Sequence, residues 1–312
     1  AAWNFINKIW NASRFVIMNL GDKTQPVLPA AETWDLTDKW ILSRLNDTVK
    51  HVTEMFDKFE FGEAGRALYN FIWNDFCDWY IEMSKEVLTG DDETAKANKQ
   101  DLLAYVLDQT LRLLQPIMPF VTEAIWQAMP HDGQSLVTAA YPVDHPEFTN
   151  PTAESDMTSL IDLIKAVRNI RAEANAPMST PIDLQIKTSD AKLQAVFEAN
   201  KDYIDRFVHP KALEIGADLV APKLAMTSVI TDAEVSVPLA ELVDLNDEAA
   251  RLEKEVAKFT AEVQRAEKKL GNERFVANAP EAVVAGEREK QADNQKKLEA
   301  TQQRLAEIKR QL

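Results

Sequence analysis

Residues 245–270 read LNDEAARLEKEVAKFTAEVQRAEKKL, and this segment predicts a long helix with one apolar seam. The seam residues follow each other at alternating spacings of four and three, which is the heptad pattern of coiled coils. They are Leu245, Ala249, Leu252, Val256, Phe259, Val263, Ala266 and Leu270. A helix with such a stripe needs a partner, because most of its stability comes from burying that face.

The partner helix is predicted in the residues that follow. The heptad pattern breaks at Gly271-Asn272 and at Ala279-Pro280. It resumes more weakly through Leu298, Leu305, Ile308 and Leu312. Two helices joined by a short break predict an antiparallel coiled-coil hairpin over residues 245–312. At 1.5 Å per residue, an arm of about 26 residues would be about 39 Å long.

Residues 1–150 are predicted to form a helical bundle, because apolar residues recur three and four apart and glycine is rare. Helix one, about 1–20, is expected to bury Ala2, Phe5, Ile6, Ile9, Trp10, Val16 and Ile17. Helix two should follow an N-cap at Thr37. Helices three, four and five are expected at about 62–88, 101–115 and 119–129.

A small α/β domain is predicted between the bundle and the hairpin, over residues 151–244. A helix at 154–175 precedes the alternating run Ile182, Leu184, Ile186, which is typical of a strand. A helix at 190–207 and short strand-like runs at 212–215, 228–231 and 234–237 complete the domain. The predicted fold class is therefore mainly α, with a helical bundle, a small α/β domain and a C-terminal hairpin.

Composition excludes several kinds of site. Cys77 is the single cysteine, so neither an internal disulfide nor a cysteine-based zinc site can form, and a cytoplasmic setting is expected. No apolar run reaches the roughly 20 residues that a membrane helix needs. The four histidines are scattered, and no phosphate loop, nucleophile elbow or metalloprotease motif is present. No catalytic residue, cofactor site or metal site is predicted.

Net charge restricts where a nucleic acid could bind. The chain carries −15 overall, which argues against nucleic-acid binding over its whole surface. Residues 246–312, however, hold fourteen basic and thirteen acidic residues, so the first 245 residues carry −16. Any contact with a nucleic acid is therefore expected to be local.

Helix one offers the first candidate contact. At 100° per residue, Asn7, Asn11 and Arg14 share one polar arc, and Phe15 flanks it. Amide and guanidinium groups can hydrogen-bond the edges of unpaired bases, and an exposed aromatic ring can stack on them. The alternative is a solvated stripe, with Phe15 packed under a neighbouring helix.

The hairpin tip offers the second candidate contact. Lys268, Lys269 and Arg274 concentrate positive charge near the turn, beside Phe275. Lysine and arginine side chains in such a cluster suit phosphate groups. The alternative is an ordinary solvated coiled-coil flank with mixed charges.

Several segments resemble the C-terminal part of class Ia aminoacyl-tRNA synthetases. These are NKIWNASRFV at 7–16, DKWILSRL at 38–45, FCDWYIE at 76–82 and PIMPFVTE at 116–123. The first segment and the tail are similar to valyl-tRNA synthetases of bacterial type. The tail motifs are VPL at 237–239, VDL at 243–245, LGNERFV at 270–276 and AP at 279–280. Residues 82–86, EMSKE, are similar to a signature loop of class I synthetases. They continue the amphipathic register of helix three, so we interpret this similarity as coincidental.

The resemblance implies a tRNA-binding module. The bundle would be the anticodon-binding domain, and the coiled-coil arm would support the outer corner of a valine-accepting tRNA. ATP-dependent aminoacylation would belong to a catalytic domain outside this sequence. The chain alone is thus expected to be a monomer without enzymatic activity or cofactor, whose partners are valine tRNA and the catalytic and editing domains of its parent. Two alternatives remain open, namely a synthetase of the isoleucine or leucine type and a coiled-coil module that binds protein.

Overall fold

The computed structural model describes residues 2–25, 27–310 and 312, apart from the side chains of Ala2 and Arg274. These residues form two compact units. Unit 1 comprises Ala1–Ile161 and Asn200–Arg206, and unit 2 comprises Asp162–Ala199 and Phe207–Leu312. In the described part of the chain, no helix is both long and apolar enough to cross a membrane.

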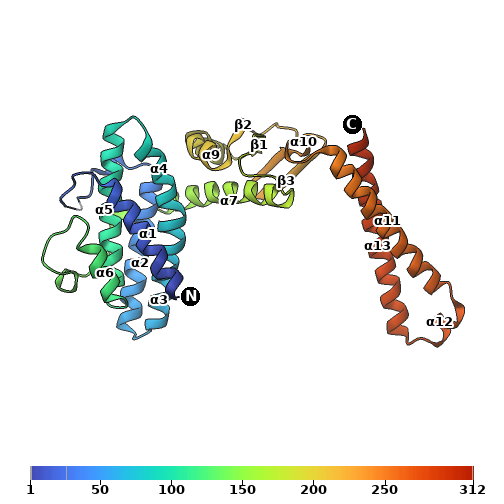
Figure 1. Cartoon of the computed structure of the whole chain (residues 1–312), viewed down its shortest axis with the longest axis horizontal. Coiled ribbons are helices and arrows are strands. Elements are labelled where there is room, and N and C mark those ends of the chain that lie inside the picture. The colour runs from blue at the N-terminus through green and yellow to red at the C-terminus, as the bar shows by residue number, and fades with distance from the viewer. Residues whose placement is uncertain (1, 26, 311) are drawn as a thin grey trace. The chain divides into compact units, whose positions relative to one another are not determined.

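Unit 1 is a helical bundle, drawn from blue to green in Figure 1. Its apolar positions are buried as the helical periodicity predicts, including Leu68, Ile72, Phe76 and Met83 of the third predicted helix. The helices are α1 (Ala2–Asn19), α2 (Leu36–Asp57), α3 (Phe61–Asn70), the π-helix η2 (Phe71–Tyr80), α4 (Ile81–Thr89), α5 (Glu93–Leu114) and α6 (Pro119–Trp126). Short 3-10 turns lie at Ala31–Thr33, Leu136–Thr138 and Pro146–Phe148.

Three details of the predicted bundle were wrong. Trp10 was expected in the core but is 49% exposed, whereas Phe5, Ile9 and Val16 are buried. Helix α2 is capped by Asp35 rather than Thr37, because the Asp35 carboxylate accepts from the Asp38 amide in a capping box. Helix α5 begins at Glu93, eight residues before the predicted start, because Asp92 caps it.

The third predicted helix, at about 62–88, is continuous in space but not uniform. Its middle ten residues, Phe71–Tyr80, form the π-helix η2, and α3 and α4 extend it on either side. π-Helical segments are rare and concentrate at functional sites. The wider turn changes which side chains meet a neighbouring helix, and η2 lies against α1.

A buried ionic network ties the start of α2 to α5 within unit 1. The Lys99 ammonium donates to the carboxylates of Asp38 and, at 3.0 Å, Asp35, and the Tyr80 hydroxyl donates to Asp38 at 2.9 Å. The Tyr203 hydroxyl adds a bond to Asp35 at 3.0 Å. Burial raises the pKa of Asp38 to about 6, assisted by the charge of Asp35 and opposed by Lys99. Burial also acts to raise the pKa of Asp35, but Lys99 and hydrogen bonds from Thr37 and the Asp38 amide outweigh it and lower that pKa to about 2.

Unit 2 contains a four-stranded sheet in the order β2-β1-β4-β3. Strands β1 and β2 are parallel and are joined through two short helices, whereas β4 is antiparallel to both of its neighbours. The elements of the sheet domain are α7 (Pro151–Glu173), β1 (Ile182–Lys187), α8 (Ala191–Ala199), α9 (Lys201–Val208), β2 (Pro210–Gly216), β3 (Ala225–Ile230), β4 (Ala233–Pro238) and α10 (Leu239–Leu242). The start of α7, up to Ile161, and most of α9, up to Arg206, belong to unit 1. The single helix predicted at 190–207 is broken at Asn200 into α8 and α9.

The predicted hairpin is present, and α11 (Leu245–Leu270) lies beside α13 (Glu281–Lys309) in Figure 1. A short helix, α12 (Glu273–Asn278), forms the tip. Ala249, Leu252, Val263 and Ala266 of the seam are buried, as are Val284, Leu298 and Ile308 of the returning helix. Leu312 was expected to extend the seam but is 59% exposed, because α13 ends at Lys309. At its base the hairpin packs against the sheet domain through a cluster of Leu224, Leu239, Ala249, Leu252 and Ile308.

Candidate nucleic-acid interface

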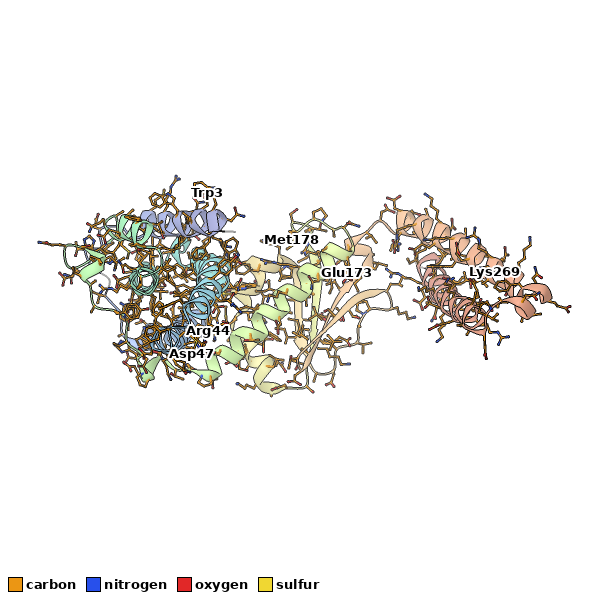
Figure 2. The ribbon with its side chains drawn as sticks, turned by 90° about the horizontal axis from the view of Figure 1, so that it is seen from below. Trp3, Arg44, Asp47, Glu173, Met178 and Lys269 are labelled. Atoms are coloured by element: carbon orange, nitrogen blue, oxygen red, sulfur yellow. The ribbon has the colours of Figure 1, made fainter. Side chains whose placement is uncertain are left out.

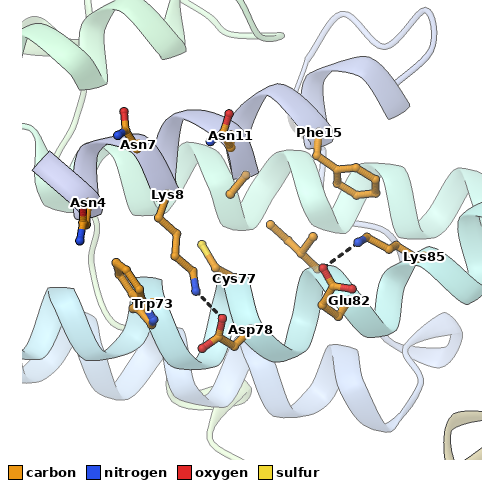
Figure 3. A pocket seen from close by; sticks show the side chains of 12 residues that line it. Asn4, Asn7, Lys8, Asn11, Phe15, Trp73, Cys77, Asp78, Glu82 and Lys85 are labelled. Atoms are coloured by element: carbon orange, nitrogen blue, oxygen red, sulfur yellow. Dashed lines mark hydrogen bonds and ion pairs between the residues drawn. The ribbon is translucent and has the colours of Figure 1, made fainter. Parts of the chain in front are cut away.

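A cleft of about 740 Å³ separates α1 from η2 and the start of α4. We call it the α1–η2 cleft, and Figure 3 shows it from close by. Polar, cationic and aromatic side chains share its walls. They belong to Asn4, Asn7, Lys8, Asn11, Ala12, Phe15, Trp73, Cys77, Asp78, Ile81, Glu82 and Lys85.

Lys8 and Trp73 lie toward one end of the cleft in Figure 3. The Lys8 ammonium pairs with the Asp78 carboxylate and lies 4.1 Å from the centre of the Trp73 ring. Trp73 itself stacks on Tyr69, whose ring centre is 5.4 Å away. This stack fixes the plane of the indole, so one aromatic face meets a cation inside the cleft.

Phe15 lies at the other end of the cleft, beside Lys85. The Lys85 ammonium is 5.3 Å from the centre of the Phe15 ring and donates to the Glu82 carboxylate at 2.7 Å. Phe15 is half-buried. Burial raises the pKa of the nearby Cys77 thiol to about 12, so this sulfur stays protonated at neutral pH and is not a nucleophile.

The asparagines lie on the rim. Asn7 and Asn11 are exposed, and Figure 3 shows their amides on the outer side of α1, while Lys8 reaches across toward Asp78. Arg14 was predicted to share their face, and its side chain is exposed. It lines a separate groove between α1 and α6 rather than the cleft. Asn7, Asn11 and Phe15 therefore line one hollow, and Arg14, which lies beside Asn7 and Asn11 on the same helix, lines another.

The predicted residues of the hairpin tip have different surroundings. Lys268 is exposed and has no ion-pair partner among the described residues. Lys269 donates to Glu287 on the returning helix at 2.7 Å and lies 5.6 Å from the centre of the half-buried Phe275 ring. The side chain of Arg274 lies outside the described part of the chain. Lys268 is therefore the described tip residue whose charge is least neutralised within the hairpin.

Sequence reasoning did not predict that Trp73, Asp78 and Lys85 line the same cleft as Asn7, Asn11 and Phe15. Helical spacing made Trp73 look like a core residue, as it does Trp79 and Tyr80, which are in fact buried. Trp73 is only half-buried. No local pattern in the sequence marks these residues, because the contacts of Lys8 with Trp73 and of Lys85 with Phe15 join different helices.

The side chains that line the cleft suit the binding of unpaired bases and phosphates. Among the described residues, no group of three or more histidine, cysteine or acidic side chains could hold a metal ion. Exposed amides, ammonium groups and aromatic faces are the groups that recognise unpaired bases and phosphates. The helix that supplies most of them, α1, has two basic residues and no acidic residue.

Comparison with known proteins gives family matches for two segments of the chain. Residues 38–187 match the anticodon-binding domain of tRNA ligases, and residues 244–309 match the tRNA binding arm of valyl tRNA synthetases. The chain is 75% identical to the valine–tRNA ligase of Lactiplantibacillus plantarum, 62% to that of Latilactobacillus sakei and 52% to that of Bacillus subtilis. Each match covers 99% of this chain but 35% of the relative, so the chain spans about a third of the length of these relatives. These matches favour neither a synthetase of the isoleucine or leucine type nor a coiled-coil module that binds protein. The chain belongs to the valine–tRNA ligase family and corresponds to the C-terminal part of its members.

Proposed function

We propose that this chain binds valine-accepting tRNA, with the anticodon loop at the α1–η2 cleft and the outer corner of the tRNA against the hairpin. The observation that carries the proposal is the cleft itself, in which Phe15 and Trp73 each stand beside a lysine. Aromatic, amide and lysine side chains meet there, and the carboxylates of Asp78 and Glu82 pair with the two lysines.

Each group of side chains has a role in this proposal. Phe15 and Trp73 stack on unpaired bases, because aromatic faces stabilise splayed bases without regard to sequence. Asn7 and Asn11 hydrogen-bond base edges, which is the contact that distinguishes one base from another. Lys8 and Lys85 attract the phosphates that connect those bases.

The chemistry of aminoacylation lies outside this chain in the same proposal. The sequence has no nucleotide-binding motif, and the α1–η2 cleft contains no histidine and one protonated thiol. The isolated chain should therefore neither form valyl-adenylate nor charge tRNA. Valine-dependent pyrophosphate exchange above a protein-free blank would contradict this.

Filter binding with three RNAs tests the tRNA proposal. Valine tRNA should bind more tightly than isoleucine tRNA, and an unrelated RNA hairpin should bind weakest. Phe15→Ala should reduce affinity for valine tRNA by about 1 to 3 kcal/mol, the range for losing one stacked base. Phe61→Ala is the matched control, because Phe61 is 58% exposed on α3 and lines no part of the cleft. Equal binding of all three RNAs, or equal effects of both variants, would overturn the proposal.

A further inference from the structure

A second hollow lies on the other flank of α1, and its lining is almost entirely apolar. We call it the α1–α6 groove, and its volume is about 220 Å³. It shares no lining residue with the α1–η2 cleft. Its walls are formed by Trp10, Ser13, Arg14, Ile17, Met18, Ala124, Ile125 and Ala128.

Ser13 is an unsatisfied polar group in this groove. Its side chain is 1% exposed, and among the described residues its hydroxyl has no hydrogen-bond partner. Hydroxyls inside helices usually donate to the carbonyl four residues earlier, as Ser84 and Thr110 do here at 2.7 and 2.6 Å. A buried hydroxyl without a partner is costly, so a ligand that hydrogen-bonds it would remove that cost.

Trp10 and Arg14 line the groove and are exposed to solvent. Trp10 is 49% exposed although it is a large apolar side chain, and Arg14 is exposed with no ion pair among the described residues. A residue with an aromatic ring, one with a buried hydroxyl and one with a guanidinium group therefore line one small apolar hollow. This combination fits a nucleotide, whose base stacks, whose base edge hydrogen-bonds and whose phosphate is an anion.

We propose that the α1–α6 groove holds an unpaired nucleobase of the same RNA that binds the α1–η2 cleft. The base stacks on Trp10, one edge exchanges a hydrogen bond with the Ser13 hydroxyl, and Arg14 contacts the adjacent phosphate. The inference rests on the proposed RNA-binding function and adds a second base site to it. Helix α1 then acts as a ridge that separates two bases of one loop.

Charge favours RNA over an apolar protein segment as the occupant. Lys8 and Arg14 are the charged residues of α1, and both are basic. Glu123 is the acidic residue of α6, and its carboxylate is held by Gln127, Ser135 and the Leu136 amide. Loops of RNA are recognised with several bases splayed apart, so two hollows on either side of one helix suit one loop.

Two exposed tryptophans on α1 provide a matched test. Trp3 is 71% exposed and lines neither hollow, and Figure 2 shows it on the outer side of α1. The probe is the anticodon stem-loop of valine tRNA, with 2-aminopurine placed at one loop position at a time. Trp10→Ala should weaken binding about tenfold and relieve the quenching of one loop position. Phe15→Ala should act at a different position, and Trp3→Ala should change neither affinity nor fluorescence.

Ser13→Ala separates a binding role from a structural one. The variant removes an unsatisfied buried hydroxyl, so its melting temperature should stay the same or rise. Its affinity for the stem-loop should nevertheless fall severalfold. If Phe15→Ala weakens binding while Trp10→Ala and Ser13→Ala do not, the groove proposal is wrong and the proposed function stands. If the wild-type chain does not bind the stem-loop, both are wrong.

Discussion

At the scale of single residues, ion pairs decide which cations are available to a ligand. Lys8 is paired with Asp78 and Lys269 with Glu287, whereas Arg14 and Lys268 have no ion-pair partner among the described residues. A phosphate that approaches a paired lysine must compete with the carboxylate already there. Equal numbers of basic residues can therefore contribute unequally to RNA binding.

Asp78→Asn tests this competition at the cleft. The substitution keeps the shape of the side chain but removes the negative charge that neutralises Lys8. RNA affinity should rise severalfold, and the salt dependence should steepen by up to about 0.7 in slope for one added single-strand contact. Glu54→Gln is the control, because it breaks the exposed pair with Lys58 at 2.5 Å on α2. Unchanged affinity in Asp78→Asn would mean that Lys8 does not contact phosphate.

The buried network around Lys99 predicts an unusual pH dependence. The pKa of Asp38 is raised from 3.8 to about 6, so its contribution to stability is fully present below pH 3.8 and is lost as pH rises through 6. Asp35 has its pKa lowered to about 2, so its contribution is present above pH 3.8 and is lost as pH falls toward 2. The two carboxylates therefore act in different pH windows and with opposite sign.

Asp38→Asn isolates the upper window. Between pH 4 and pH 7, the unfolding free energy of the wild type should fall relative to that of the variant by roughly 3 kcal/mol. This follows because the pKa of Asp38 is about two units higher in the folded than in the unfolded chain, and each unit corresponds to about 1.36 kcal/mol. Urea unfolding followed by tryptophan fluorescence measures this difference at each pH. A gap between wild type and variant that is constant with pH would show that Asp38 does not titrate in this window.

At the scale of elements, sequence periodicity predicted the helices, the strands and the hairpin seam well. It succeeded because burial repeats at 3.6, 3.5 or 2 residues wherever an element has one apolar face. It could not identify the π-helix η2, because apolar residues at Ile72, Phe76 and Trp79 fit an α-helix equally well. The candidate site was predicted only in part for the same reason. Which flank Arg14 and Trp10 occupy depends on where α6 and η2 pack against α1, and no local pattern contains that information.

The hairpin tip gives a prediction at this scale. Lys268→Ala should lower tRNA affinity and reduce the salt dependence by up to about 0.9 in slope, the value for one duplex phosphate contact. Lys269→Ala should have a smaller effect, because Lys269 already pairs with Glu287 at 2.7 Å. Preference among anticodons should not change in either variant, because phosphate contacts carry no sequence information. Lys309→Ala, which breaks a pair with Glu253 away from the tip, is the control. An effect of Lys309→Ala as large as that of Lys268→Ala would contradict a specific role for the tip.

At the scale of the whole molecule, the division into two units matters most. The hairpin and the sheet domain belong to one unit, because Leu224 and Leu239 of the sheet domain share a cluster with Ala249, Leu252 and Ile308. The helical bundle has its own core and its own buried network. Independent cores predict independent unfolding.

Deleting residues 246–312 tests this independence. All seven tryptophans lie between Trp3 and Trp126, within unit 1, so their fluorescence reports on the bundle alone. The fluorescence melting midpoint should therefore be the same with and without the hairpin.

Circular dichroism at 222 nm reports on both units. It should show that the truncated unit 2 unfolds at lower temperature, because Leu224 and Leu239 lose their cover and each buried side chain of this size contributes about 1.5 to 3 kcal/mol. Leu252→Ala in the full chain should have the same direction of effect on unit 2 and none on the fluorescence transition. A shift of the fluorescence midpoint by several degrees on deletion would show instead that the two units unfold together.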